Sequence, residues 1–160
     1  MGSNSSASGH LDQMTVTRQR IGISAADLYA IVVDPTSYPN WLVGTKRIRT
    51  VSPNWPAEQS FFEHSVGFGP VVIPDTTSVR EVEPPRLLEL MVRARPVIEA
   101  VVRFEISPIV GGSEVTMTET PVGLHTLISP ILEPLVRARN QRSLGRLRDF
   151  AENQPRSRVS

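Results

Sequence analysis

The sequence predicts a single α+β domain in which a series of antiparallel strands is followed by one long C-terminal helix. First, residues 60–120 consist of short strand-like runs separated by brief turns rich in glycine and proline, which is typical of an antiparallel meander. Second, apolar residues recur at helical spacing from about residue 127 to residue 152. The length of 160 residues suits one domain with a core of its own.

The composition excludes several classes of protein. The chain has no cysteine, so a disulfide framework, a thiolate metal site and a cysteine nucleophile are ruled out. A formal net charge of +1 is too small to indicate a nucleic acid or an anionic membrane surface as partner. No apolar run approaches the roughly 18 residues that span a bilayer, and the N-terminus has no apolar signal core. We therefore expect a cytoplasmic protein that is a monomer or a weak homodimer.

Both ends of the chain have the composition of disordered segments. Residues 1–13 are rich in serine, glycine and asparagine, which is typical of a flexible polar tail or an added leader. Residues 153–160 are polar and contain a proline, so they have little to bury. The predicted folded domain therefore spans residues 14–152.

The first elements of this domain are a strand and two short helical segments. Residues 15–23 alternate in polarity and predict a strand. Ser24 suits a helix N-cap, with Asp27 three residues later in place of the usual glutamate of a capping box. The helix should end before Pro35, because the residue before a proline is pushed out of the α region. Residues 36–41 can form only another short turn.

The central part of the chain predicts a meander of short strands. Glycines and a proline around Phe68 indicate a turn. We expect an irregularity at Pro74-Asp75, because an interior proline cannot donate to a strand ladder. A further turn is expected at Arg95-Pro96. The predicted strands cover residues 46–52, 60–66, 71–82, 87–94, 97–106 and 114–120.

The last predicted element is a long amphipathic helix over residues 127–152. Pro130 suits its start. Its arginines are spread around the helix, whereas one face is apolar with Asn140 in its middle. The apolar residues of that face are Leu132, Val136, Leu144, Leu147 and Ala151.

Three stretches of the sequence resemble a known family. DPTSYPNW (residues 34–41), EVEPPRLLEL (residues 81–90) and FEISPIVGGSEVTMTE (residues 104–119) resemble the polyketide cyclase/dehydrase branch of the START-like, or SRPBCC, superfamily. The resemblance runs in the same order from about Val16 to Glu152. Each stretch alone is moderately specific, and the three in register indicate the fold.

The resemblance implies a helix-grip fold. In this fold a curved antiparallel sheet of about six or seven strands wraps around the long C-terminal helix, with two short helices after the first strand and a deep cavity between sheet and helix. Members bind lipids, sterols, polyketides or plant hormones, and some cyclise or dehydrate aromatic polyketides. The family shares no universal catalytic motif, so the fold alone does not settle function.

Candidate ligand-binding residues follow from strand alternation, which places every second side chain on the inner face of the sheet. An apolar lining with a few polar groups is the usual composition of a small-molecule pocket. Asn140 would lie on the inner helix face, where it could bind the ligand or a neighbouring turn. The candidates are Trp41, Phe62, His64, Leu88, Leu90, Phe104, Met117, Val136 and Asn140.

Three polar residues are candidates for catalysis. His64 is the only histidine in a predicted strand, and it could be a general acid or base, or a core histidine bonded to a carbonyl or water. Glu119 could orient a ligand hydroxyl or end its strand in solvent. Arg80 could stabilise an enolate from inside the cavity, or face outward and pair with Glu63 or Glu89.

The leading hypothesis is binding of a small hydrophobic ligand that is lipid-, polyketide- or aromatic-like. One alternative is a polyketide cyclase or dehydratase that uses the same cavity, and another is a cochaperone-like partner module. The sequence has no glycine-rich nucleotide-binding motif, and its three histidines lack the spacing of metal ligands. We expect no cofactor and no metal.

Overall fold

The computed structural model describes residues 14–94, 98–123 and 129–155. The predicted tails at residues 1–13 and 156–160 and the predicted turn at Arg95-Pro96 lie outside the described residues. So do the first residues of the predicted C-terminal helix, 127 and 128.

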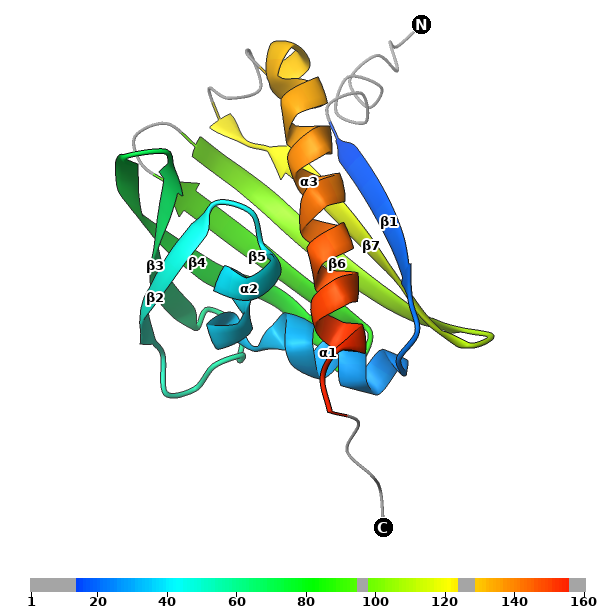
Figure 1. Ribbon diagram of the computed structural model, residues 1–160. Helices are drawn as coiled ribbons and strands as arrows, with labels where there is room; N and C mark the ends of the chain where they lie inside the picture. The colour runs from blue at the N-terminus through cyan, green and yellow to red at the C-terminus, as the bar shows by residue number, and fades with distance from the viewer. Residues whose placement is uncertain (1–13, 95–97, 124–128, 156–160) are drawn as a thin grey trace, which may run out of the picture.

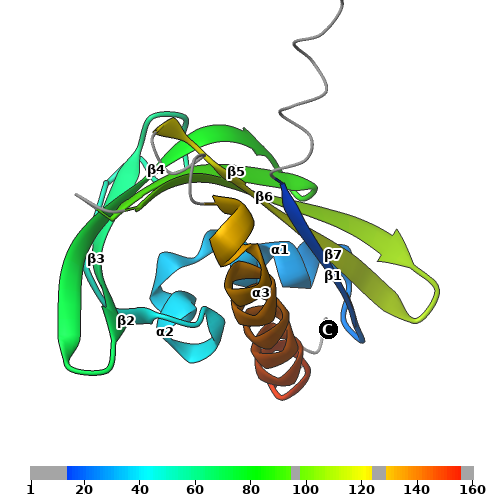
Figure 2. The same cartoon turned by 90° about the horizontal axis from the view of Figure 1, so that it is seen from above.

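The predicted α+β fold class is confirmed. Seven strands form one antiparallel sheet in the order β1-β7-β6-β5-β4-β3-β2, so consecutive strands from β2 to β7 are neighbours and β1 closes the β7 side. Figure 2 shows that the sheet is strongly curved. The strands are β1 (Thr15–Ile21), β2 (Thr45–Val51), β3 (Phe61–Phe68), β4 (Val71–Glu83), β5 (Leu87–Ala94), β6 (Ile98–Ile109) and β7 (Gly112–Pro121).

The helices all lie on the concave side of the sheet (Figures 1 and 2). The long helix α3 crosses that face; in the view of Figure 1, α2 lies to the left of its lower half and α1 lies at its lower end. The predicted N-cap is confirmed, since the backbone N–H of Asp27 donates to Ser24 Oγ at 3.1 Å. The helical segments are α1 (Ala25–Val33), the 3-10 turn η2 (Pro35–Ser37), α2 (Tyr38–Trp41) and α3 (Ser129–Glu152).

The core fills the space between the concave face and the helices. Edge-to-face aromatic pairs tie the short helix α2 to the sheet: Trp41 packs on Phe104 with ring centroids 6.0 Å apart, and Tyr38 packs on Phe62 at 5.5 Å. The largest fully buried side chains are Trp41, Tyr38, Phe62, Phe104, Leu28, Leu87, Leu88, Met117, Leu144, Leu147, Val32 and Val115.

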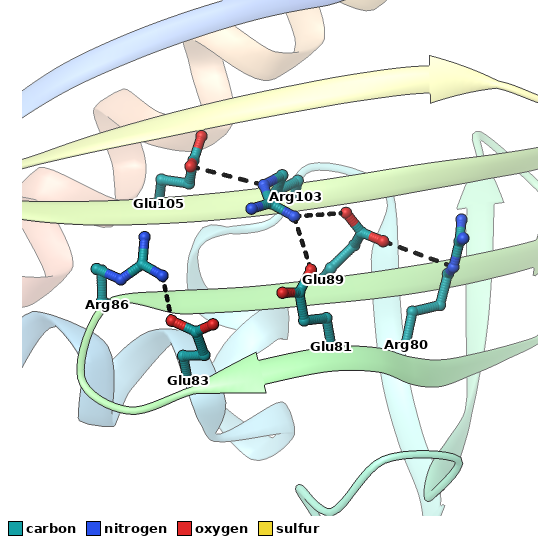
Figure 3. Close-up of polar contacts among 7 residues, drawn as sticks. All are labelled: Arg80, Glu81, Glu83, Arg86, Glu89, Arg103 and Glu105. Carbon is teal, nitrogen blue, oxygen red and sulfur yellow. Dashed lines mark hydrogen bonds and ion pairs between the residues drawn. The ribbon is translucent and has the colours of Figure 1, made fainter.

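The convex face carries charged side chains instead. Figure 3 shows Arg103 of β6 among three carboxylates, with its guanidinium 3.0 Å from Glu81, 2.9 Å from Glu89 and 3.6 Å from Glu105. Burial lowers the pKa of Arg103, but hydrogen bonds to Glu89 and Glu81 outweigh it, and the net shift is upward. Arg80 adds an ion pair with Glu89 at 3.5 Å. Strand alternation therefore sends apolar groups inward and charges outward on these central strands.

Two details of the strands differ from the prediction. The expected irregularity at Pro74-Asp75 is wrong, because Pro74 pairs in register with Ser65 on β3, and the ladder with β5 begins only at Thr76. The irregularity in β4 lies between Val79 and Glu81 instead. In addition, β3 continues through Phe68, so the β3–β4 turn contains only residues 69 and 70.

The predicted inner face of the long helix is correct only for its second half. Asn140, Leu144 and Leu147 are fully buried, whereas Leu132 is exposed and Val136 is half-buried. Figure 1 shows the reason: the first turns of α3 extend past the ends of the neighbouring strands. The helix is therefore held to the sheet by its C-terminal half.

This difference between the two halves of α3 predicts very different costs for the same substitution. Leu147→Ala should destabilise the domain by about 3 kcal/mol, because it opens a cavity at a position that is 0% exposed. Leu135→Ala is the matched control on the same helix; its side chain is 69% exposed, and the cost should stay below about 0.5 kcal/mol. Urea unfolding of both variants measures the difference, and similar midpoints would contradict this packing of α3.

Candidate ligand-binding site

A small cavity lies between the concave face of the sheet and the helices. Its volume is about 70 Å³, and it is reached by side chains from every strand except β1. Most of its surface is apolar. The lining residues are Tyr38, Leu42, Val43, Thr45, Phe62, His64, Val66, Asp75, Thr77, Leu90, Val92, Ala100, Val102, Phe104, Met117, Glu119 and Arg139.

The apolar wall of the cavity is a direct product of strand alternation. Phe62 and Val66, four residues apart on β3, project from the same face, and so do Leu90 and Val92, two residues apart on β5. In the β5–β6 ladder, Leu90 lies opposite Val102, so their side chains share the concave face. The structure therefore brings together four of the predicted apolar lining residues: Phe62, Leu90, Phe104 and Met117.

A buried polar cluster interrupts this wall on β3 and β4. His64 lies directly opposite Asp75 in the β3–β4 ladder, and its Nε2 is 3.0 Å from Asp75 Oδ2 and 3.1 Å from Thr77 Oγ1. The His64 and Asp75 side chains are 4% and 0% exposed. Asp75 Oδ1 accepts a hydrogen bond of 3.1 Å from the backbone N–H of Arg93. Two atoms of the cluster, His64 Nδ1 and Asp75 Oδ2, are buried without a hydrogen-bond partner among the described residues.

A second polar cluster joins α3 to β7 at the opposite wall. Arg139 forms an ion pair with Glu119 and donates a hydrogen bond to it. It also donates a hydrogen bond of 3.0 Å to Asn140 Oδ1. Asn140 Nδ2 donates to the same carboxylate oxygen at 3.1 Å. Every partner in this cluster is therefore engaged, and the positive and negative charges offset each other. Such a closed network suits a structural tie between helix and sheet.

Tyr38 also lines the cavity, but its hydroxyl is already committed. The hydroxyl donates to the backbone carbonyl of Val32 at 2.8 Å. Burial raises the pKa of Tyr38 far above its ordinary value, and the negative charge of Asp34 adds to this. Tyr38 therefore stays neutral at physiological pH and serves as a wall rather than as a proton-transfer group.

Several predicted site residues lie outside the lining of the cavity. Trp41 and Leu88 are fully buried in the core, and Val136 is half-buried on α3. Asn140 is buried beside Glu119, where it supports the lining without forming it. Arg80 faces outward and pairs with Glu89, which is the second of its two predicted placements.

Three residues of the two polar clusters in the lining were not predicted: Asp75, Thr77 and Arg139. The first two could have been found from the turn. A two-residue connection at 69–70 pairs Phe68 with Val71 and, counting back along both strands, His64 with Asp75. Arg139 gives no such signal, because nothing in the helix periodicity distinguishes it from the other arginines of α3.

The described residues 14–94, 98–123 and 129–155 contain no group of three or more histidine, aspartate or glutamate side chains that could hold a metal ion. Among the same residues, no helix is both long and apolar enough to cross a membrane.

The closed network around Asn140 predicts a stability cost for its removal. Asn140→Ala should lower the free energy of unfolding by about 2 kcal/mol, because it removes the hydrogen bonds that the buried Asn140 makes with Glu119 and Arg139. Asn40→Ala, at an exposed position, is the matched control and should change the free energy of unfolding by less than about 0.5 kcal/mol. Equal unfolding curves for the two variants would show that the network adds nothing to the stability of the domain.

Solved structures with the same fold extend over almost the whole chain. A Rhodobacter sphaeroides protein superposes with a TM-score of 0.73 at 16% identity, covering 89% of this chain and 93% of its own. The Zhui aromatase/cyclase from a Streptomyces species superposes with a TM-score of 0.72 at 12% identity, covering 90% and 96%. The di-domain aromatase/cyclase BexL from the BE-7585A biosynthetic pathway has a TM-score of 0.70 at 14% identity, covering 89% of this chain and 50% of that one. At these identities the likeness shows the fold alone.

The sequence itself identifies the family. No curated protein matches the chain. The family model for polyketide cyclase/dehydrase and lipid transport proteins, however, matches residues 13–152, which include all seven strands and all the helices described above. The resemblance found in the three sequence stretches is thereby confirmed, and the chain belongs to the polyketide cyclase/dehydrase and lipid transport family.

Proposed function

We propose that this protein binds a small hydrophobic ligand in the cavity between the sheet and α3. The observation that carries the proposal is the lining itself: apolar side chains from five elements face one small space, and polar groups enter it mainly at the two clusters described above. Burial of apolar surface contributes about 25 cal/mol per Å², so such a lining favours a ligand with an apolar body.

The volume of the cavity limits what it can hold as it stands. Pockets that enclose drug-sized ligands usually measure about 300–1,000 Å³, whereas this cavity has about 70 Å³. A larger ligand therefore requires the cavity to expand. We expect the first turns of α3 to be the part of that helix that moves most easily, because Ile131 and Leu135 are exposed there and the buried anchors begin only at Asn140. Of the described α3 residues, Arg139 is the one that lines the cavity.

The proposal predicts micromolar binding of a small aromatic probe. The full chain should bind 1-methylnaphthalene with a free energy near −8 kcal/mol, measured by the fluorescence of the probe. Leu90→Trp should abolish binding, because Leu90 lines the cavity and the indole would fill it. Met91→Trp is the matched control: Met91 follows on the same strand, faces the other side of the sheet, and lines an open groove there.

Two results would contradict the proposal. One is that the wild-type protein fails to bind the probe at all. The other is that Leu90→Trp, shown to be folded by a cooperative unfolding transition, binds as tightly as Met91→Trp, which would place the site elsewhere.

A specific observation favours an enzyme as the second candidate. A cyclase or dehydratase must transfer a proton inside a dry cavity. His64 is a buried imidazole beside a carboxylate, and both residues line the cavity. A carboxylate that orients an imidazole is a recurring arrangement in general-base catalysis. Arg80, on the outer face, does not contribute to such a site.

Measurements of turnover and of ligand binding distinguish an enzyme from a carrier. If the protein is an enzyme, His64→Ala should lower turnover of an aromatic polyketide-type substrate by about a hundredfold, the usual value of one acid or base. Binding of 1-methylnaphthalene should change much less, because apolar burial dominates it. Arg80→Ala is the control and should leave turnover unchanged. If the protein is a carrier, which is the leading proposal, wild-type turnover should be absent.

A further inference from the structure

We infer that the side chain of Arg139 is a gate that controls access to the cavity, and that its ion pair with Glu119 holds the gate closed. The inference rests on the proposed ligand-binding function and specifies how a ligand enters. It follows from the position of Arg139 between the cavity and solvent, from the way its guanidinium is held, and from the small volume of the cavity.

Arg139 occupies the boundary between the cavity and solvent. It lines the cavity, and 27% of its side chain is exposed. The other half-buried residues of the lining are compact and apolar, so they cannot leave the boundary unless the backbone moves: Leu42, Val43, Val66 and Val92. The arginine has a long unbranched stem and can leave by rotation about its own bonds, with its charged end in water throughout.

Two neighbours hold the guanidinium of Arg139 in its inward position. One is the carboxylate of Glu119 on β7, which forms an ion pair and a hydrogen bond with it. The other is Asn140, whose Oδ1 accepts hydrogen bonds of 3.2 Å from Nε and 3.0 Å from Nη2. A partly exposed ion pair is weak, because water competes for both charges. The closed position is therefore favoured, but little free energy is needed to open it.

The domain stays intact when this side chain swings outward. Asn140 is fully buried, and its Nδ2 donates to Glu119 Oε2 at 3.1 Å, so this link between α3 and β7 does not pass through Arg139. On the C-terminal side of Asn140, Leu144 and Leu147 anchor the helix. On its N-terminal side, none of the described side chains at 130–139 is buried. Arg139 therefore lies at the end of the unanchored half of α3.

The volume of the cavity makes this opening necessary for a ligand. About 70 Å³ is too little for a naphthalene ring system. An outward swing vacates the space of the Arg139 side chain and connects the cavity to solvent. A ligand then binds only the open state, and its apparent affinity is reduced by the fraction of molecules that are open. The gate should therefore limit the rate of association and leave the rate of dissociation almost unchanged.

Glu119→Gln tests the gate with the smallest change in shape. The amide has nearly the size of the carboxylate and can still accept the hydrogen bond from Asn140, but it forms no ion pair with Arg139. Stopped-flow fluorescence of 1-methylnaphthalene gives both rates. We expect association about tenfold faster than in the wild type, the factor that corresponds to one weak ion pair with its hydrogen bond. Dissociation should stay within about twofold, whereas loss of an ordinary binding contact mainly changes dissociation.

Three further variants show whether the effect passes through Arg139. Arg139→Ala removes the gate itself and should raise the association rate by a similar factor. Its combination with Glu119→Gln should add nothing, because the carboxylate acts only through the guanidinium. Arg142→Ala is the matched control: Arg142 is exposed on the same helix and does not line the cavity, so both rates should be those of the wild type. Each variant is first shown to unfold cooperatively.

Two kinetic results would contradict the gate. One is additive acceleration by Glu119→Gln and Arg139→Ala, because the two substitutions would then act independently. The other is an equal acceleration in Arg142→Ala, because loss of any arginine from α3 would then have the same effect.

Ionic strength tests the ion pair without a substitution. Salt screens charges that are partly exposed, and the neutral probe has no electrostatic attraction of its own to lose. Association with the wild type should become faster as sodium chloride rises from about 20 mM to about 500 mM, whereas Glu119→Gln should not respond. Equal salt dependence in the two proteins would contradict the role of the ion pair.

A measurement without ligand separates the gate from the proposed function. In protein labelled with ¹⁵N-arginine, the Nε resonance of Arg139 is the one missing from the spectrum of Arg139→Ala. It should show exchange between two positions in the wild type and should move toward the resonance of the exposed Arg142 in Glu119→Gln. If the wild type binds no probe, the proposed function fails, and two positions of Arg139 would still support the gate. A single rigid position that is unchanged in Glu119→Gln would overturn the gate even if the cavity binds the probe.

Discussion

The domain depends on the contact between the C-terminal half of α3 and the concave face of the sheet. A single curved sheet has an apolar face that it cannot bury alone, and here Leu144, Leu147 and Ala151 cover it. The N-terminal half of the same helix makes no comparable contact, since Ile131 and Leu135 are exposed. The helix therefore closes one end of the concavity tightly and leaves a small space toward the other end. The cavity is a consequence of this uneven packing.

The polar groups of the cavity divide by whether their hydrogen bonds are complete. Glu119, Arg139 and Asn140 satisfy one another and join β7 to α3, so their burial is explained by the fold. His64 and Asp75 lie on neighbouring strands that are already held by their backbone ladder. Among the described residues, His64 Nδ1 and Asp75 Oδ2 have no hydrogen-bond partner, although Oδ2 lies 3.0 Å from His64 Nε2. The backbone ladder, rather than this pair, therefore holds the two strands together.

The sequence predicted the fold well because alternation and helical periodicity are local signals. It located Phe62, Leu90 and Phe104 on the inner face for that reason. One omission and one open alternative had a common origin in strand parity. A turn centred on Phe68 hides the pairing of His64 with Asp75. On β4, strict alternation back from the inward Val82 would place Arg80 inside, but the register shift between Val79 and Glu81 reverses the parity and turns Arg80 outward. Bulges depend on the partner strand, which no local pattern specifies.

The His64–Asp75 pair is the costly part of the cavity wall. An unsatisfied buried polar group costs about 1–3 kcal/mol, and a domain is stable by only about 5–15 kcal/mol in total. Replacement of a buried ion pair by apolar residues of similar volume is often neutral or stabilising. Valine and threonine occupy equivalent inward positions on the same two strands, at Val66 and Thr77, so smaller groups are compatible with this wall. Under the second candidate function this cost has a physical reason, because an imidazole beside a carboxylate can transfer a proton and an apolar pair cannot.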